Sequence, residues 1–448
     1  MMKKLKSTLV GLGVAGVFGL VGCTGGKQSV SHTEPVFNDD KSITIAAWYG
    51  PNAYDETQLK YIAESGIDTF YLQDGGMNPT VTRPKIEALG EVGTYAYVYG
   101  TPDAARVEYV EKYTDLENFK GFTFDEPDKQ QIDELSKYVN IYNQKGAGKN
   151  FFVNLFPSFA EKVGLGFGHG PDKFDSYLQY YSDKIASKVQ TGEKWLSVDR
   201  YPLKNNGDDR YLDTGWLYDL EAMARFGKEN GFKTNFFMQT MPYGFDHNVT
   251  PSYNDIRMQL YTVMAFGYDG ISEFCYQTPP IGKEFNEKQL AMIDREGKPT
   301  PIYDAAKKAN HEIKNFDHVY LSFDWQGVFT NDAGKTITEK PRKSSNLSFS
   351  SMRYAMEIAE IDSVKSVYSS QDTLFGYFTD VDAREALMLV NYNETSSAQN
   401  DTVKISFDAS RYRYCQVYRG GSKQIVELSD GVLELELGIG EGVFVIPY

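Results

Sequence analysis

Eight short β-rich runs, most of them separated by segments of helical spacing, constrain the fold of this chain more than any other feature. The runs lie at 43–49, 68–73, 94–99, 121–126, 150–156, 195–201, 234–240 and 270–276. Apolar residues recur at helical intervals among charged ones at 56–64, 127–144, 172–188, 217–230, 252–266 and 302–315. Strands that alternate with helices favour a parallel sheet.

The number of these units favours a closed barrel over an open sheet. Eight units over roughly 275 residues match the usual size of a (β/α)8 barrel. An open, doubly wound sheet is the alternative, but no glycine-rich phosphate loop follows the first run. We therefore predict an α/β fold, with a (β/α)8 (TIM) barrel over residues 42–322.

The pattern changes after Val319, where helical spacing almost disappears. Alternating apolar and polar residues at 386–393, 402–407, 416–418, 432–437 and 442–448 predict strands joined by polar turns. One short helix is possible near 352–361. We predict an all-β sandwich over 323–448 and expect it to do no more than brace the barrel.

The N-terminus has the layout of a secretory signal. Lys3, Lys4 and Lys6 precede an uncharged stretch over 8–22, which is too short and glycine-rich to span a bilayer comfortably. Its end, Leu-Val-Gly-Cys23, resembles the lipobox of bacterial lipoproteins, and the resemblance implies that Cys23 carries lipid. An ordinary signal peptide with a chance cysteine is the alternative.

These features predict a protein that is exported and lipid-anchored to the bacterial membrane, at the cell surface or in the periplasm. Residues 1–22 would be the signal peptide and 23–41 the lipidated cysteine and a flexible tether. The membrane would be contacted through the lipid only.

Charge and aromatic content narrow the class of ligand. The formal net charge of −15 makes nucleic acid an improbable partner, because the acidic body would repel phosphate backbones. Aromatic residues make up 14% of the chain, and their faces can stack on sugar rings. Neutral carbohydrate polymers carry no charge that the acidic protein would repel.

The active site of a (β/α)8 barrel forms at the carboxyl ends of its strands. In this sequence those ends carry carboxylates, amides and aromatic rings, with almost no lysine or histidine. Such groups suit uncharged, polyhydroxylated ligands, and they predict neither a cofactor nor a metal site. Besides the acids, the candidate substrate-binding residues are Trp48, Tyr99, Asn154, Tyr201, Gln239 and Tyr276. The lone His169, in the loop 164–171, is more simply a loop residue than a ligand contact.

The sharpest motif is Asp125-Glu126-Pro127, at the end of the fourth run. Cleavage of a glycosidic bond requires one carboxylic acid to protonate the leaving oxygen and a second carboxylate across the site. A structural alternative is that these acids only begin a helix, since Pro127 suits a first helical position.

The motif resembles the Asn-Glu-Pro acid/base motif of the clan of (β/α)8 glycoside hydrolases that includes beta-galactosidases. The resemblance implies that Glu126 is the general acid/base and that Asp125, in place of asparagine, contacts substrate. Asp125 could also raise the pKa of Glu126 through like charge. The segments 199–202, 296–303 and 310–312 are also similar to exported hydrolases of this kind.

The second catalytic carboxylate is less constrained. The clan places it at the end of the seventh strand, but run 234–240 contains no acid. Glu273 and Asp199 are the remaining candidates. Glu273 could instead be a buried acid paired with Arg257, and Asp199 could be paired with Arg200.

Taken together, these features predict a glycoside hydrolase acting on an oligo- or polysaccharide. A non-catalytic glycan-binding lipoprotein of the cell surface is the principal alternative, supported by the missing acid in run 234–240. A barrel enzyme of another class, such as an aldolase or a metal-dependent hydrolase, is disfavoured because the strand ends lack a lysine or a histidine cluster.

Overall fold

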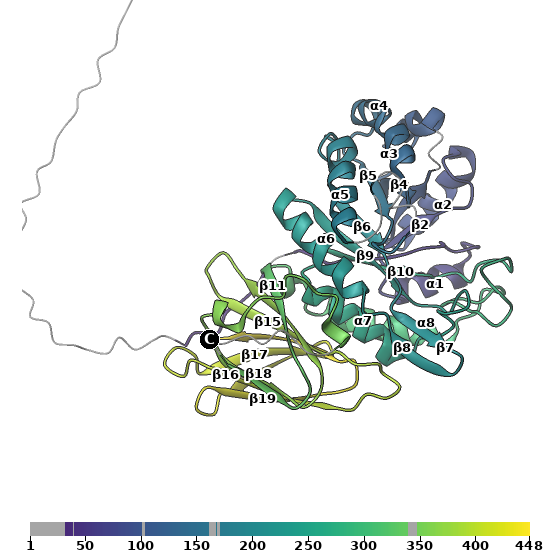
Figure 1. Cartoon of the computed structure of the whole chain (residues 1–448). Helices are drawn as coiled ribbons and strands as arrows, with labels where there is room; N and C mark the ends of the chain where they lie inside the picture. Colours follow the sequence, from purple (N-terminus) through teal and green to yellow (C-terminus); the bar gives the residue numbers. More distant parts are fainter. Residues whose placement is uncertain (1–31, 39, 101–103, 161–166, 168–170, 339–346) are drawn as a thin grey trace, which may run out of the picture.

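Residues 32–448 are described by the computed structural model, except for residue 39 and segments 101–103, 161–166, 168–170 and 339–346. Figure 1 shows a barrel of strands surrounded by helices, followed by packed β-sheets at the C-terminus. The predicted signal sequence 1–22, Cys23 and His169 lie outside the described residues. Within the described part of the chain, no helix is long and apolar enough to cross a membrane.

Eight parallel strands close the first domain into a barrel, in the order β1-β10-β9-β6-β5-β4-β3-β2. Each predicted β-rich run overlaps one of them, so the (β/α)8 fold is confirmed. The strands are β1 (Thr44–Ala47), β2 (Thr69–Leu72), β3 (Tyr95–Tyr99), β4 (Phe119–Asp125), β5 (Asn150–Leu155), β6 (Trp195–Asp199), β9 (Lys233–Gln239) and β10 (Gly270–Phe274). Parallel pairing brings their carboxyl ends to one mouth.

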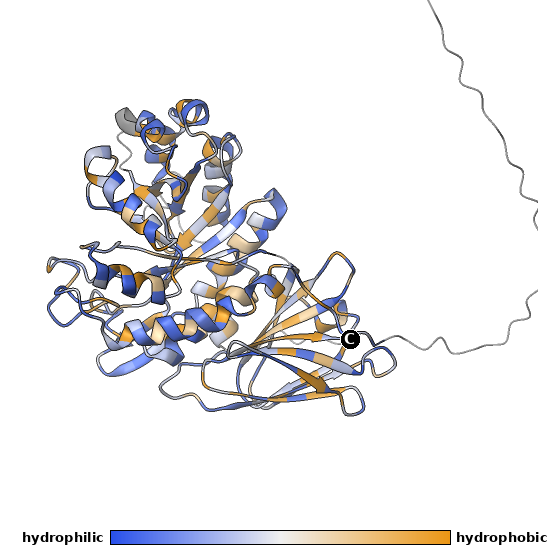
Figure 2. Cartoon of the chain, turned by 180° about the vertical axis from the view of Figure 1, so that it is seen from behind, coloured by the Kyte–Doolittle hydropathy of each residue, from blue (hydrophilic) through white to orange (hydrophobic). Residues whose placement is uncertain are grey.

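Helices surround the barrel and bury their apolar faces against it. They are α1 (Glu56–Glu64), α2 (Pro79–Glu91), α3 (Lys129–Ser136), α4 (Val139–Lys145), α5 (Pro171–Tyr181), α6 (Trp216–Asn230), α7 (Tyr253–Ala265), α8 (Pro301–Lys314) and the short α9 (Asp317–Tyr320). A 3-10 helix, η1 (Ala104–Lys112), follows β3, and a π-helical turn (Ser182–Ala186) extends α5. Figure 2 shows hydrophobic residues along the strands, with hydrophilic and hydrophobic residues mixed around the helices.

The predicted helix 127–144 is wrong as a single element. It divides into α3 and α4, because the Ser136 hydroxyl donates to the Asp133 carbonyl and competes with the helical ladder where α3 ends. Asp128 caps α3 by accepting from the backbone N–H of Gln131, whose side chain bonds back in a capping box.

The second domain contains a six-stranded antiparallel sheet of β11 (Asp324–Asn331), β14 (Thr373–Thr379), β15 (Glu385–Asn391), β20 (Gly442–Pro447), β17 (Tyr414–Arg419) and β18 (Ser422–Glu427). A four-stranded sheet of β12 (Lys335–Thr338), β13 (Val364–Ser369), β16 (Asp401–Phe407) and β19 (Val432–Leu437) packs on it. The possible helix at 352–361 is instead one 3-10 turn, Ile358–Glu360.

The two domains share one continuous apolar core, which includes α7 and the six-stranded sheet. The approach is close at Gly376, where a Cβ would lie 2.2 Å from the Ala265 carbonyl oxygen. At a second contact between the domains, the indole N–H of Trp216 donates to the Tyr392 hydroxyl at 2.6 Å. A rigid contact of this kind favours domains that do not swing freely.

The predicted tether is not free along its whole length. The Pro35 carbonyl accepts from the Gln416 side chain at 2.6 Å, and the Phe37 ring lies 5.4 Å from that of Phe323. The chain is therefore packed on the second domain before it enters β1.

Candidate active site

A cavity of about 530 Å³ opens at the mouth of the barrel. Strand ends and the loops that follow them supply its walls. Of the candidates identified from sequence, six line it: Trp48, Asp125, Glu126, Asn154, Asp199 and Tyr201. The predicted location at the carboxyl ends of the strands therefore holds for these residues.

Asp125 and Asp199 are joined by a single amide group. The Asn154 Nδ2 donates to Asp125 Oδ1 at 3.1 Å and to Asp199 Oδ1 at 3.0 Å. These two oxygens therefore lie within about 6 Å of each other, because both contact one nitrogen. Asn154, predicted to bind substrate, here holds two acids together.

A chain of hydrogen bonds inside the barrel fixes the orientation of that amide. The Asn154 Oδ1 accepts from the Ser197 hydroxyl at 2.8 Å, and the Ser197 oxygen accepts from Asn235 Nδ2 at 2.9 Å. Ser272 donates to Asn235 Oδ1 at 3.0 Å and contacts the Tyr71 hydroxyl at 3.0 Å. Because the Asn154 oxygen is occupied, both hydrogens of its nitrogen point to the aspartates.

The surroundings of the two aspartates favour their protonated forms. Burial raises the pKa of Asp125 to about 6, although the Asn154 hydrogen bond opposes the rise. Burial, and next the nearby charge of Asp125, raise the pKa of Asp199 to about 7, while hydrogen bonds from Asn154 and Tyr201 oppose it. Two interacting acids titrate as a pair, so they hold one proton between them near neutral pH.

Glu126 projects from a strained position on the same wall. Its φ of 42° and that of Tyr49, 54°, lie in the left-handed region, which costs a residue other than glycine about 1–3 kcal/mol. The Glu126 N–H donates to the Asn154 carbonyl at 2.8 Å and so fixes this turn. Since Asp128 caps α3, neither Asp125 nor Glu126 is required to begin that helix.

Arg200 lines the cavity but is already neutralised. Its guanidinium contacts Asp213 at 2.9 Å and Asp219 at 3.0 Å, so it is not the partner of Asp199. Burial lowers the pKa of His247 and favours the neutral ring. Among the described lining residues, no other basic side chain faces the cavity. The site suits an uncharged ligand.

Aromatic rings make up much of the remaining wall. Tyr201 packs edge-on to Tyr243 with centroids 5.2 Å apart, and Trp48 packs edge-on to Phe237 at 5.6 Å. Tyr99 does not line the cavity but supports Trp48 at 5.8 Å. Sequence reasoning at strand ends missed the residues that later loops contribute, namely His247, Glu284 and Phe285.

Besides Tyr99, three further sequence candidates lie outside the cavity. Glu273 is fully buried behind the barrel wall beside Asn310 of α8, so its assignment as a catalytic carboxylate is withdrawn. Tyr276 is also fully buried, packed edge-on to Phe70 at 4.9 Å. Gln239 is buried and donates to two carbonyls of the loop beyond β9.

Glu273 lies outside the cavity because successive side chains of β10 point to opposite faces of the barrel wall. Ser272 and Phe274 face the barrel interior and its mouth, so Glu273 between them must face the helices. Among the described residues no basic side chain pairs with Glu273, and Arg257 donates to the Ile439 carbonyl instead. The expected pairing with Arg257 is therefore also wrong.

No family model and no curated protein matches the sequence. Among solved structures, alpha-galactosidase I from Mortierella vinacea is similar with a TM-score of 0.49 and 10% identity, over 90% of this chain and 96% of that one. A GH27 β-L-arabinopyranosidase from Geobacillus stearothermophilus is similar with a TM-score of 0.47 and 8% identity, over 91% of this chain and 96% of that one. A beta-galactosidase from Halorubrum lacusprofundi is similar with a TM-score of 0.37 and 13% identity, over 65% of this chain but only 60% of that one.

Proposed function

We propose that this protein is a glycoside hydrolase that cleaves an oligo- or polysaccharide in the cavity at the barrel mouth. The observation that carries the proposal is the pair of carboxylates bridged by Asn154 within an aromatic-walled cavity. Glycoside hydrolysis requires a protonated acid and an ionised carboxylate at the same site. Environments that raise two pKa values to different extents supply such a pair.

A pair that shares one proton can supply both roles. Asp199, whose pKa is raised by burial and by the charge of Asp125, would hold the shared proton and donate it to the leaving glycosidic oxygen. Asp125 would then be the ionised member of the pair and would attack the anomeric carbon. Asp199 would then take a proton from the water that hydrolyses the glycosyl-enzyme ester.

The spacing of the pair favours retention of anomeric configuration. Retaining enzymes separate their carboxyl groups by about 5–5.5 Å and inverting enzymes by about 6.5–9.5 Å. The two oxygens that contact the Asn154 nitrogen are separated by at most about 6 Å, which lies below the inverting range.

Glu126 offers a second assignment within the same function. As the general acid/base implied by its motif, it would work with Asp125 or Asp199, and the spare aspartate would bind a sugar hydroxyl. Trp48 and Tyr201 would stack on sugar rings in either case. A lipid at Cys23 would hold the enzyme at the membrane after export.

The test is a panel of chromogenic glycosides and polysaccharides offered to the wild-type protein and to Asp125→Asn, Asp199→Asn and Glu126→Gln. We expect turnover of at least one substrate, loss of turnover in the two aspartate variants, and sugar binding that persists in both. A large loss in Glu126→Gln with little loss in one of the two aspartate variants would favour the second assignment. Binding without turnover in any form would instead support the non-catalytic glycan-binding alternative.

A further inference from the structure

The segment 241–248, called the rim loop here, carries one wall of the cavity. Tyr243 and His247 of this loop line the cavity and stack with centroids 4.7 Å apart and an interplanar angle of 12°. The Tyr243 N–H donates to the His247 carbonyl at 3.1 Å. The position of this loop therefore sets the position of both rings.

The first support of the rim loop is the hairpin of β7 (Leu203–Asn206) and β8 (Asp209–Leu212), which follows β6. The Asn205 N–H donates to the Asp246 carbonyl at 2.9 Å, and the Asn248 N–H donates to Asn205 Oδ1 at 2.9 Å. Lys204 adds an ion pair with Asp246 at 3.1 Å. The hairpin thus holds the outer edge of the loop.

The second support is Gln239 at the end of β9. Its Nε2 donates to the Met241 carbonyl at 3.2 Å and to the His247 carbonyl at 3.0 Å. Gln259 of α7 holds the peptide of Gln239 in turn, accepting from its N–H at 2.9 Å and donating to its carbonyl at 3.0 Å. This support therefore begins on α7.

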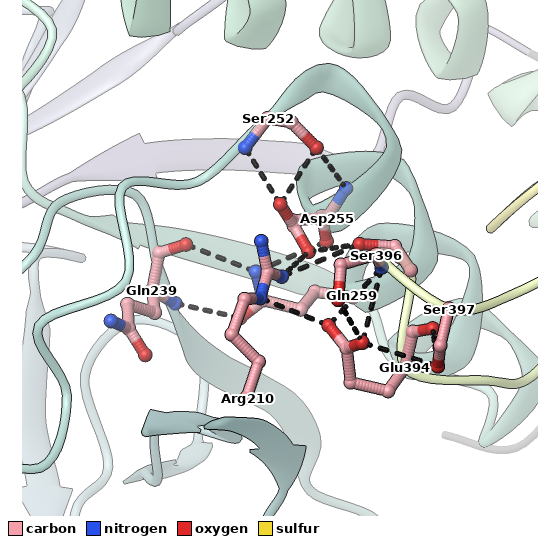
Figure 3. A network of polar contacts seen from close by, with 9 residues as sticks. Arg210, Gln239, Ser252, Asp255, Gln259, Glu394, Ser396 and Ser397 are labelled. Carbon is pink, nitrogen blue, oxygen red and sulfur yellow. Dashed lines mark hydrogen bonds and ion pairs between the residues drawn. The ribbon is translucent and has the colours of Figure 1, made fainter. Parts of the chain in front are cut away.

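Both supports meet at Arg210, which pairs with Asn205 across the hairpin. Its Nη2 contacts Asp255 Oδ1 at 2.5 Å, and its Nε lies 2.9 Å from Glu394 Oε1 (Figure 3). Glu394 belongs to the loop between β15 and β16 of the second domain. One guanidinium therefore joins the hairpin to the second domain.

The position of Arg210 is tightly constrained, because the carboxylate of its partner Asp255 is fully buried. It accepts from the Ser252 N–H and hydroxyl at 2.8 and 2.7 Å, and from the Thr395 hydroxyl of the second domain. The Asp255 carbonyl also accepts from Gln259 at 3.2 Å, one turn along α7 (Figure 3). A buried charge tolerates the loss of its counterion poorly, so Arg210 must stay in place.

We propose that the second domain, through Glu394, positions the rim loop and thereby contributes to substrate binding. Arg210 and Glu394 are positioning residues, and neither lines the cavity within the described residues. The role in substrate binding rests on the proposed function, whereas the ordering of the loop does not. This extends the second domain beyond the bracing role expected from sequence.

The test compares Glu394→Gln with Arg353→Met in the full chain. Arg353 makes a different contact between the domains, an ion pair with Asp172 of α5 at 2.8 Å. In the described part of the chain its side chain makes no polar contact with the hairpin. Hydrogen exchange of the amides of residues 241–248 is measured by mass spectrometry, together with the thermal unfolding midpoint. We expect exchange at least about fivefold faster in Glu394→Gln and unchanged in Arg353→Met.

Kinetics with any substrate found for the wild type separate this proposal from the previous one. We expect Glu394→Gln to raise KM about three- to tenfold with kcat nearly unchanged, since the acids keep their places. Unchanged exchange in Glu394→Gln, or equal acceleration in both variants, would overturn the proposal. Faster exchange in Glu394→Gln alone, in a protein that hydrolyses nothing, would support the ordering of the loop and remove its enzymatic role.

Discussion

Two buried acidic centres of the barrel, one at its mouth and one behind its wall, show what turns a carboxylate into a candidate catalyst. Burial is the largest cause of a raised pKa in both, to about 7 for Asp199 and to about 8 for Glu273. Asp199 opens into the cavity and shares an amide donor with a second acid. Glu273 is 0% exposed, and neither of its oxygens has a well-formed hydrogen bond within the described residues.

The comparison teaches that a raised pKa does not by itself mark a catalytic residue. The centre at the mouth lines the cavity, where a second carboxylate and an oriented donor accompany Asp199. Glu273 has only the raised pKa. Burial without access costs stability and yields no chemistry.

The sharpest test of this contrast removes the amide beside each acid. Asn154→Ala deprives both aspartates of their shared donor, and we expect kcat to fall about a hundredfold. Asn310→Ala, beside Glu273, should change kcat by less than about threefold while lowering the unfolding midpoint. Steady-state kinetics and thermal unfolding of the two variants decide the matter. Equal losses of kcat would remove the distinction between the two centres.

The pH profile of hydrolysis offers a second test. Below about pH 6 both aspartates carry protons and no nucleophile is available, whereas above about pH 7 both are ionised and no acid remains. We expect a bell-shaped kcat/KM with its maximum between these values, falling about tenfold per pH unit on either side. Glu273→Gln should leave the profile in place. A flat profile from pH 5 to 8 would contradict the shared proton.

Stability should respond to Glu273 in the opposite manner to activity. The raised pKa means that folding favours the protonated acid, so its contribution is complete below about pH 4.5 and is lost as pH rises towards 8. We expect Glu273→Gln to raise the unfolding midpoint by several degrees at pH 8 and by little at pH 5. Thermal unfolding at both pH values measures this. A variant less stable at pH 8 than the wild type would show that the ionised acid has an unseen partner.

The smallest expected effect on kcat comes from the hydrogen bonds behind Asn154, inside the barrel. Ser197→Ala leaves the Asn154 oxygen without its donor, so the amide can turn away from the aspartates. We expect kcat to fall about three- to tenfold and KM to stay within about twofold. Ser272→Ala, two hydrogen bonds further from Asn154 than Ser197, should have a still smaller effect on kcat. A larger loss from Ser272→Ala would place the critical contact elsewhere.

The sequence allowed the barrel and part of its mouth to be predicted. Eight runs of the right length and spacing fixed the topology, and the motif at Asp125 and Glu126 placed two acids at the mouth. Asp199 followed from the same rule of strand ends. These predictions succeeded because strand order in a barrel follows chain order.

Other parts of the site could not be predicted in the same way. Glu273 lies near the end of β10 and so fits the rule of strand ends, although Ile271, an apolar residue two positions earlier, indicates that this face of β10 packs against helices. The place of His247 in the cavity wall depends on the path of a loop, and the role of Arg210 depends on a contact with another domain. Such long-range contacts leave no local pattern in the sequence.

The most direct test of the central claim is a double-mutant cycle of Asp125→Asn, Asp199→Asn and the double variant on a glycoside that the wild type hydrolyses. If the two aspartates act as one catalytic pair, each single variant loses at least about a thousandfold in kcat, and the double variant loses little more. If either single variant keeps more than about a tenth of the wild-type kcat, or the losses multiply, the pair is not the catalytic centre.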